Sequence, residues 1–252
     1  MSSTRIIILA GGKGTRMKSE LPKPLIRLNG ETLLSRLLTS VKAANIDPHP
    51  IVVAGYRHDL ITAEVGDRAS VVIQTEQRGT GHATAVGMEE VGDATQVIVL
   101  YADHPFTSAQ TLQHLIKTHE ANHNTLTLFT TTIPSYDGWY IAFERWGRIV
   151  RSPEGVIQKI VEYKDATPEI RAIKEVNPAI CCFDAKWLKN VLPRLTNQNM
   201  QNEFYLVDTI ELAMRDGQKI GSASIPPEET IGINSPEELA IAEALLQKQH
   251  KT

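Results

Sequence analysis

Cysteine is scarce in this sequence, and long apolar runs are missing. The two cysteines, Cys181 and Cys182, are adjacent in an apolar segment. They are too few for a disulfide framework or a zinc site, and adjacent cysteines rarely bridge each other. We therefore expect small buried thiols in a reducing compartment. No run approaches the ~18 apolar residues of a membrane helix, and the first residues do not resemble a secretion signal. These observations predict a cytoplasmic protein without a membrane partner.

An excess of charge of either sign is also lacking. The 252 residues include 26 Lys and Arg against 29 Asp and Glu, which gives a net charge of −3. Nucleic-acid-binding proteins usually display a strongly basic surface, so we expect no nucleic-acid partner and only local affinity for anions. With 42% hydrophobic residues, the chain is long enough for one large α/β domain.

Short β-branched runs alternate with helical patterns in the first half of the chain. The runs at 4–10, 49–55, 69–75, 95–102 and 125–133 predict buried strands, whereas 31–44 and 107–121 have apolar residues at helical spacing. Thr107 and Gln110 form a capping-box pattern that would begin the second of these helices. Buried strands separated by helices predict a mostly parallel sheet with helices on both faces.

The pattern changes after about Pro134. Residues 136–173 are aromatic, turn-rich and alternating, which predicts a mixed sheet and an insertion over 134–183. The α/β pattern returns near 206–215. The last helix is expected to begin after Ser235, a good N-cap that is followed by proline and two glutamates.

Glycines and cations gather in ILAGGKGTRMKSELPKPL, residues 8–25. Gly11, Gly12 and Gly14 follow the first strand and precede the first predicted helix, and ligands bind at the carboxyl ends of strands in open α/β sheets. A Walker A motif would need Ser or Thr at Gly14, and a dinucleotide fingerprint would need glycine at Met17. We therefore expect a loop whose amide groups hold a phosphate chain; the alternative is a solvated glycine turn.

Two cations flank this glycine loop. Lys23 lies between Pro22 and Pro24, whose fixed φ angles would present its side chain in one direction. Together with Arg16 it would neutralise the phosphates. An ordinary exposed lysine is the alternative.

These residues resemble the signature of sugar-1-phosphate nucleotidylyltransferases. Further matching motifs follow in order: QTEQRGTGHA (74–83), LYADHP (100–105), GRIVR (147–151), IVEYKDAT (160–167), NEFYLVD (202–208) and GINSPEEL (232–239). Over nearly the whole chain they are similar to the uridylyltransferase domain of the bifunctional bacterial enzyme that makes UDP-N-acetylglucosamine. The resemblance implies a Rossmann-like, three-layer α/β/α fold with a mostly parallel mixed sheet and a sugar-binding insertion. It implies one domain over 1–252, with a nucleotide-binding half (1–133) and a sugar-binding half (134–252).

The reaction implied by the resemblance transfers UMP from UTP to a sugar-1-phosphate, with Mg²⁺ as cofactor and N-acetylglucosamine-1-phosphate as the first acceptor to consider. No covalent intermediate is required, in agreement with the lack of a Ser-His-Asp or Cys-His signature. The implied catalytic positions are Arg16, Lys23 and Asp103. The implied nucleotide-binding positions are Leu9, Ala10, Gly11, Gly12, Lys13, Gly14, Gln74, Gly79 and Thr80.

The remaining implied positions bind sugar and metal. Asp103 and Asn234 would hold Mg²⁺, which takes few protein ligands beside phosphate oxygens; because Thr107 is the expected helix cap, Asp103 is free for this role. The implied sugar-binding positions are Gly147, Glu162, Lys164 and Asn177. Glu162 and Lys164 are two residues apart and would share one side of a strand. A surface charge pair is the alternative for them, and a simple strand end is the alternative for Gln74.

Several positions depart from the family pattern and leave the acceptor sugar open. Ala102 and Ala179 replace glycine, Pro178 replaces threonine, and His104 replaces a usually aliphatic residue. Three aromatic residues, Trp139, Tyr140 and Trp146, would crowd the rim of the sugar pocket or belong to the core. The hexapeptide-repeat acetyltransferase domain of the bifunctional enzyme has no counterpart in this sequence, so no acetyl transfer is expected.

Three alternatives to the main prediction stay open. The same chemistry could use another sugar-1-phosphate or another nucleoside triphosphate. A non-catalytic nucleotide-sugar sensor is a second alternative, although it would have little reason to keep Arg16, Lys23 and Asp103. A glycosyltransferase is a third, but it usually shows paired aspartates where this chain has Asp103-His104-Pro105.

Overall fold

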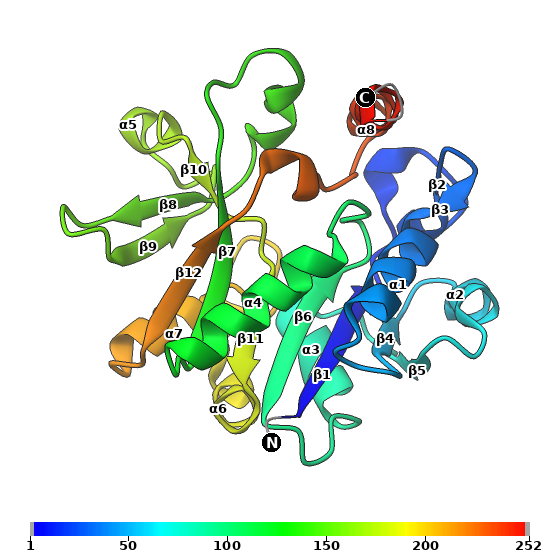
Figure 1. The fold of residues 1–252 in the computed structure, drawn as a ribbon, viewed down its shortest axis with the longest axis horizontal. Helices are drawn as coiled ribbons and strands as arrows, with labels where there is room; N and C mark the ends of the chain where they lie inside the picture. The colour runs from blue at the N-terminus through cyan, green and yellow to red at the C-terminus, as the bar shows by residue number, and fades with distance from the viewer. Residues whose placement is uncertain (1–2, 250–252) are drawn as a thin grey trace.

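One large mixed sheet organises the molecule (Figure 1), which is described for residues 3–249 of a computed structural model. Its ten strands are β1 (Thr4–Ala10), β4 (Ile51–Ala54), β5 (Ser70–Ile73), β6 (Gln96–Tyr101), β7 (Leu126–Thr132), β8 (Arg148–Arg151), β9 (Ile157–Val161), β10 (Glu175–Val176), β11 (Cys181–Asp184) and β12 (Ile220–Ser224). They follow the order β5-β4-β1-β6-β11-β7-β10-β8-β9, and β12 pairs with β7. A separate small hairpin joins β2 (Arg27–Leu28) to β3 (Glu31–Thr32).

Helices connect and cover these strands. The α-helices are α1 (Leu33–Ala44), α2 (His58–Val65), α3 (Thr80–Met88), α4 (Ala109–Ala121), α5 (Pro168–Arg171), α6 (Ala185–Val191), α7 (Asp208–Arg215) and α8 (Pro236–Gln249). Short 3-10 turns are η1 (Thr15–Met17), η2 (Lys23–Leu25), η3 (Gly138–Phe143), η4 (Leu192–Arg194) and η5 (Pro227–Glu229). Among the described residues, no helix has the length and apolar character needed to span a membrane.

The buried residues of β1 divide between two layers of helices. Ile6 and Ile8 belong to one core cluster with residues of α1, α2 and α4, whereas Ile7 and Leu9 belong to another with residues of α3, α6 and α7. Successive side chains of a strand point to opposite faces, so a strand buried on both sides has a continuous apolar sequence. The predicted three-layer α/β/α fold with a mostly parallel core is confirmed.

The order of the parallel strands places one edge of the sheet for ligand binding. β1 pairs in parallel with β4 on one side and β6 on the other. The chain therefore leaves β1 toward β4 and β5 and later returns to add β6 on the opposite side. Such a reversal opens a crevice at the carboxyl ends of the strands. The glycine loop follows β1 and Asp103 follows β6, so both lie at this edge.

The predicted helix over 31–44 is α1, which begins at Leu33; between it and the glycine loop lie the turns η1 and η2 and the β2–β3 hairpin. One local prediction at this edge is wrong. Ser108, and not Thr107, is the N-cap of α4, because the Ser108 side chain accepts a hydrogen bond from Thr111 N. Thr107 is buried, and its hydroxyl has no hydrogen-bond partner.

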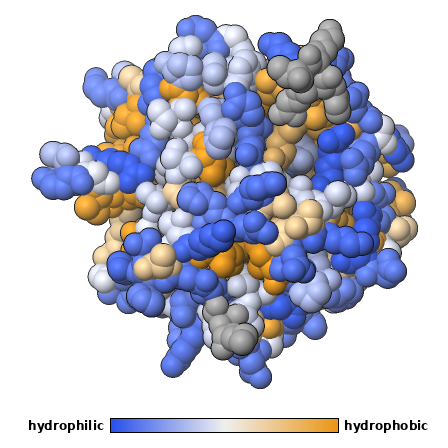
Figure 2. All heavy atoms as spheres, viewed as in Figure 1, coloured by the Kyte–Doolittle hydropathy of each residue, from blue (hydrophilic) through white to orange (hydrophobic). Residues whose placement is uncertain are grey.

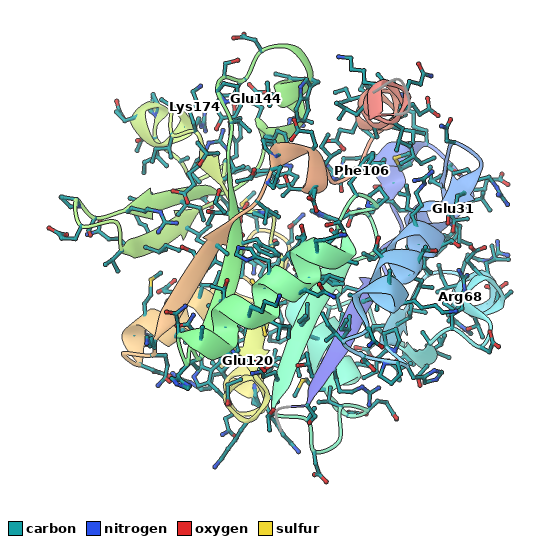
Figure 3. The ribbon with its side chains drawn as sticks, in the orientation of Figure 1. Glu31, Arg68, Phe106, Glu120, Glu144 and Lys174 are labelled. Atoms are coloured by element: carbon teal, nitrogen blue, oxygen red, sulfur yellow. The ribbon has the colours of Figure 1, made fainter. Side chains whose placement is uncertain are left out.

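The segment after Pro134 adds the turn η3, which contacts α8, and three strands at one end of the sheet. The strands β8, β9 and β10 pair in antiparallel fashion. Arg148 in β8 is fully buried, and its guanidinium donates to the carbonyl oxygens of Glu144, Trp146 and Arg171. Glu144 is labelled on this part of the molecule in Figure 3. These bonds hold the insertion together through its own backbone.

Outside the core, the surface is mainly hydrophilic on the face shown in Figure 2, with apolar residues in separate patches.

The two thiols are buried in β11, and burial raises the pKa of Cys181 to about 12. A thiol that stays protonated is a poor nucleophile, so these cysteines are structural, as expected.

Candidate active site

The glycine loop is shaped by its neighbours at the end of β1. Gly11 O accepts a hydrogen bond from Tyr56 N, and Lys13 Nζ lies 5.4 Å from the centre of the Tyr56 ring. Gly12 is exposed, with no atom within 4 Å of the point where a Cβ would stand. Leu9 and Ala10, the last residues of β1, anchor the loop to the buried sheet. The loop is therefore fixed at its start and open to solvent at its tip.

Gly14 and Lys23 are in direct contact. Gly14 has φ +66°, and a Cβ there would stand 2.6 Å from Lys23 Cβ. Only glycine meets both demands, a left-handed backbone and a close approach. Pro22 and Pro24, both buried, flank Lys23 in η2. The glycine loop thus rests on the aliphatic stem of a lysine whose backbone is fixed.

The head of Lys23 joins two residues that are distant in sequence. Its ammonium group donates to Asp103 Oδ2 at 2.5 Å and to Asn234 Oδ1 at 2.9 Å. The Lys23 and Asp103 side chains are only 19% and 10% exposed. The structure therefore brings Lys23 into contact with Asp103 and Asn234, the two predicted metal ligands, beside the glycine loop.

The electrostatic state of this cluster follows from that contact. Burial alone would raise the pKa of Asp103, but the Lys23 ammonium and the neighbouring His104 outweigh it, so the net shift is downward. Burial lowers the pKa of His104, and the opposing charge of Asp103 does not offset this shift. At neutral pH Asp103 is therefore ionised and His104 is neutral.

Glu238 holds Asn234 in place, a role that sequence reasoning missed. Its carboxylate accepts a hydrogen bond from Asn234 N at 2.5 Å, while Glu238 N donates to Ser235 Oγ at 3.3 Å. This is a capping-box arrangement at the start of α8 that extends to the residue before the cap. The Ser-x-x-Glu spacing was the available signal. Burial raises the pKa of Glu238. The charge of Arg16, an exposed residue of η1, offsets only part of this rise.

The predicted base-reading residues lie next to the glycine loop. Gln74 is buried; its amide nitrogen donates to Gly79 O at 3.2 Å, and its amide oxygen would stand 3.0 Å from a Cβ at Gly11. Gly79 has φ +102° and no room for a side chain, and Thr80 Oγ1 accepts from Leu206 N. These contacts bind 79–80 to the segment 204–206. Base recognition by Gln74, Gly79 and Thr80 stays a prediction.

Three of the four predicted sugar-binding residues are close together. Asn177 N donates to Gly147 O at 2.9 Å, and a Glu162 carboxylate oxygen would stand 3.0 Å from a Cβ at Gly147. Partial desolvation of its carboxyl group raises the pKa of Glu162, and Asp165 and Asp208 raise it further. Glu162 and Lys164 are both exposed and both lie beyond the end of β9 at Val161, so the expectation that they share a strand face is wrong. The sugar-binding roles are untested predictions.

The departures from the family pattern have structural consequences here. Ala179 adopts φ +61°, a conformation that alanine rarely takes, and Asn177 Oδ1 accepts a hydrogen bond from its backbone N–H. His104 is buried between the rings of Tyr101 and Trp146, and the centre of its ring lies 6.1 Å and 5.8 Å from their centres. Its Nδ1 has no hydrogen-bond partner. Trp146, with Trp139 and Tyr140, packs on the core cluster that includes α8.

The donor set fits Mg²⁺ in kind. Carboxylate and amide oxygens are the ligands of this hard cation, which retains waters and phosphate oxygens as its other ligands. Asp103 Oδ2 and Asn234 Oδ1 already point at one cation, the Lys23 ammonium. Within residues 3–249 there is no cluster of three or more His, Cys, Asp or Glu residues that could hold a metal without such outside ligands.

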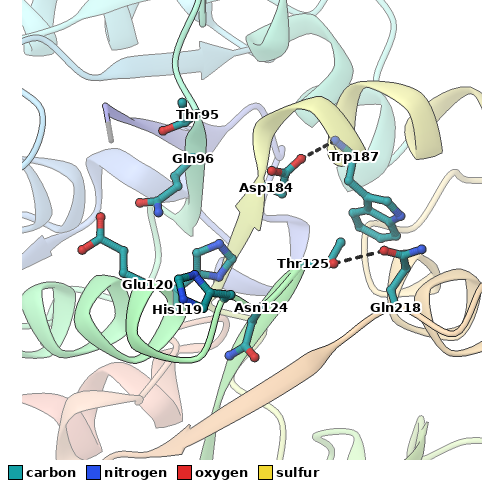
Figure 4. Close-up of a pocket in the computed structure, with 10 residues that line it drawn as sticks. Thr95, Gln96, His119, Glu120, Asn124, Thr125, Asp184, Trp187 and Gln218 are labelled. Atoms are coloured by element: carbon teal, nitrogen blue, oxygen red, sulfur yellow. Dashed lines mark hydrogen bonds between the residues drawn. The ribbon is translucent and has the colours of Figure 1, made fainter. Parts of the chain in front are cut away.

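A cavity lies elsewhere in the molecule. It measures about 720 Å³ and is lined by residues at the amino end of β6 and around the start of β7 (Figure 4). Several of its polar groups have structural partners: Asp184 caps α6, and Thr125 donates to Gln218. In Figure 3, Phe106 near the carboxyl edge is well separated from Glu120 near this cavity. The cavity is therefore separate from the cluster formed by Lys23, Asp103 and Asn234.

A parallel α/β core that ends in a glycine loop beside a lysine, an aspartate and an asparagine is the arrangement expected of a nucleotidyltransferase. Residues 6–200 match the MobA-like NTP transferase domain, and the chain belongs to this family. It is 38% identical over its whole length to the bifunctional protein GlmU of Limosilactobacillus fermentum, of which it covers 54%. It is 35% identical to the GlmU of Clostridioides difficile, with 97% of this chain and 52% of the relative covered. The chain thus spans about half the length of these curated relatives.

Solved structures of similar fold agree. A putative glucose-1-phosphate thymidylyltransferase from Bacillus anthracis superposes with a TM-score of 0.75 at 16% identity, covering 96% of this chain and 95% of that one. A CMP:2-keto-3-deoxy-manno-octonic acid synthetase in complex with CTP gives 0.70 at 16% identity, covering 98% and 100%. At these identities the likeness establishes the fold. The predicted membership of a nucleotidyltransferase family is confirmed by the family match, and the predicted similarity to the bifunctional enzyme is confirmed by the GlmU relatives.

Proposed function

We propose that this protein transfers UMP from UTP to a sugar-1-phosphate and releases pyrophosphate, with N-acetylglucosamine-1-phosphate as the first acceptor to test. The observation that carries the proposal is the convergence of Lys23, Asp103 and Asn234 beside the glycine loop. The family membership and the GlmU relatives support the reaction class. An oxygen of the sugar phosphate would bond to the α-phosphorus of UTP as the bond to the β-phosphate bridging oxygen breaks.

Each part of the site has a proposed role in this reaction. Both reactants are anions, so the protein must offset their repulsion and align them. The open tip of the glycine loop, with Lys13, would hold the triphosphate, and Arg16 would stabilise the departing pyrophosphate. Lys23 would neutralise the α-phosphate as its geometry changes. Mg²⁺ held by Asp103 and Asn234 would neutralise phosphate oxygens.

The two substrates are proposed to lie on either side of this cluster. Gln74, Gly79 and Thr80 would receive the uracil ring. Gly147, Glu162 and Asn177 would receive the sugar, with Lys164 near its phosphate if the turn after β9 brings it inward. The methyl group of Ala179, which is partly exposed, is the feature we expect to distinguish acceptors, whereas Ala102 is buried in the core.

The test is a pyrophosphate-release screen of the purified protein with five nucleoside triphosphates crossed with sugar-1-phosphates. We expect turnover with UTP and an amino-sugar phosphate. Turnover with another pair would revise the substrate only, whereas nucleotide-sugar binding without turnover by any pair would support a sensor.

The variants Asp103→Asn and Lys23→Met test the assigned roles. Each should lower kcat/KM by about 10²-fold or more, because each removes charge stabilisation at the reacting phosphate. Asp93→Asn is the matched control, since Asp93 is an exposed aspartate in the turn before β6. Near-normal rates in the Asp103 or Lys23 variant, with thermal stability unchanged, would contradict the assignment.

A further inference from the structure

The Lys23 ammonium occupies the position in which a cation would meet both proposed metal ligands. It is 2.5 Å from Asp103 Oδ2 and 2.9 Å from Asn234 Oδ1. The distance to Asn234 is that of a charge-assisted hydrogen bond, and the distance to Asp103 is shorter still. A divalent cation between the same two oxygens would lie within a few ångströms of this positive charge. The two cations therefore compete for one place.

The rest of the site offers a divalent cation little to overcome that competition. The second carboxylate oxygen of Asp103 is 3.9 Å from His104 Nε2, too far for a hydrogen bond. The other nearby carboxylate, Glu238, is engaged with Asn234 N. A single carboxylate whose charge is already balanced by lysine is a weak site for a metal that prefers several anionic oxygens.

The stem of Lys23 connects this cluster to the glycine loop. A side chain at Gly14 would collide with Lys23 Cβ, so the loop and the lysine stem are in contact. A triphosphate held by the loop would thus bring negative charge beside the same lysine. Because the η2 backbone is fixed by two prolines, the long side chain is the part that can move from carboxylate to phosphate.

We propose that Lys23 is a resident cation that holds Asp103 and Asn234 together in the free protein and gives them up to a divalent metal when a nucleotide arrives. Metal and nucleotide therefore bind together. Asp103 has a cationic partner in both states: Lys23 in the free protein and the metal in the complex. The inference rests on the proposed function for the identity of the nucleotide, but the competition itself involves only the protein and the metal.

The test measures Mn²⁺ binding, by electron paramagnetic resonance of free Mn²⁺, without and with a non-hydrolysable UTP analogue. Lys23→Met should bind Mn²⁺ alone about tenfold or more tightly than the unmodified protein. Lys18→Met, which removes an exposed charge from the same loop, should stay within about twofold. The analogue should tighten Mn²⁺ binding in the unmodified protein, and this coupling should shrink in Lys23→Met. Adding Asp103→Asn to Lys23→Met should abolish the gain.

Each outcome bears on the proposal. Equal or weaker Mn²⁺ binding by Lys23→Met, or no measurable binding by any variant, would overturn it, as would a gain that survives the loss of Asp103. Lys23→Gln serves as a second variant if methionine disturbs folding, since its amide can still donate to Asp103. If the pyrophosphate screen finds no substrate pair while Lys23→Met gains affinity for Mn²⁺, the competition stands and the assigned reaction falls. If the screen finds a substrate pair while Lys23→Met gains no affinity for Mn²⁺, the proposed competition falls and the assigned reaction stands.

Discussion

At the scale of single residues, the site depends on how closely one glycine approaches one lysine. Gly14 has a left-handed backbone and leaves 2.6 Å between a would-be Cβ and Lys23 Cβ. Neighbouring glycines differ, because a Cβ at Gly12 would meet nothing within 4 Å. Position within the motif is therefore a poor guide to what each glycine does, and local geometry is a better one.

Gly14→Ala should lower both stability and activity. Alanine at this φ is strained, and its methyl would displace Lys23, at a combined cost of about 1–3 kcal/mol in the free energy of unfolding. Urea denaturation would measure the stability change, and the pyrophosphate assay would measure the rate. Gly12→Ala is the matched control for stability and should stay within about 0.5 kcal/mol of the unmodified protein. Equal stability of the two variants would contradict the steric argument.

At the scale of elements, the start of α8 does two tasks. Ser235 and Glu238 complete the helix cap, and the same Glu238 carboxylate fixes the backbone of Asn234. A change in this cap should therefore reach the metal ligands and not only the helix.

Glu238→Ala should destabilise the protein by about 0.5–2 kcal/mol, the usual cost of a lost cap, and should also weaken Mn²⁺ binding in the presence of nucleotide. Thermal denaturation would measure the change in stability, and electron paramagnetic resonance of free Mn²⁺ would measure the change in Mn²⁺ binding. Glu237→Gln removes a negative charge from an exposed residue of the same turn and is the control for charge. A loss of stability with unchanged Mn²⁺ affinity would show that Glu238 only caps the helix.

The elements themselves could be predicted because burial leaves a clear record in sequence. Runs such as IIIL in β1 are apolar on both faces, so strands and fold class followed from the pattern. Caps were less predictable, since Thr107 and Ser108 are adjacent residues of similar chemistry and only the chain path decides which one meets Thr111 N. Lys164 was placed on a strand that ends at Val161, because strand ends have no comparable signal.

At the scale of the whole molecule, the site unites residues that are far apart in the chain. Lys23 is 80 residues from Asp103 and 211 from Asn234. The rule that parallel strands share a carboxyl edge predicted that Asp103 lies near the glycine loop. Asn234 was predicted only from the family resemblance, because no periodicity in the sequence connects the segment before α8 to β6. The Lys23 contacts required the structure.

Acid sensitivity is a further property of the whole molecule, and His119 in α4 allows a test. It is buried, and its Nδ1 lies 3.0 Å from Thr127 Oγ1. Burial lowers the pKa of His119, and the opposing charges of Asp184 and Glu120 are weaker. The unfolded chain therefore binds a proton at higher pH than the folded protein does, so stability should fall as the pH drops below about 6.5.

His119→Gln keeps a side chain able to bond Thr127 and cannot titrate. Between pH 7 and pH 5 its unfolding free energy should fall less steeply than that of the unmodified protein. The two slopes should differ by at most about 1.4 kcal/mol per pH unit, the value for one proton. Part of the slope should remain, because His104 is also buried with a lowered pKa. His123→Asn is the control, since His123 is exposed and has φ +49°, which asparagine tolerates. Urea titrations across this pH range would measure both slopes. Equal slopes for the His119 variant and the unmodified protein would mean that His119 accepts its proton without unfolding, and the acid response would then rest on His104 and the carboxylates.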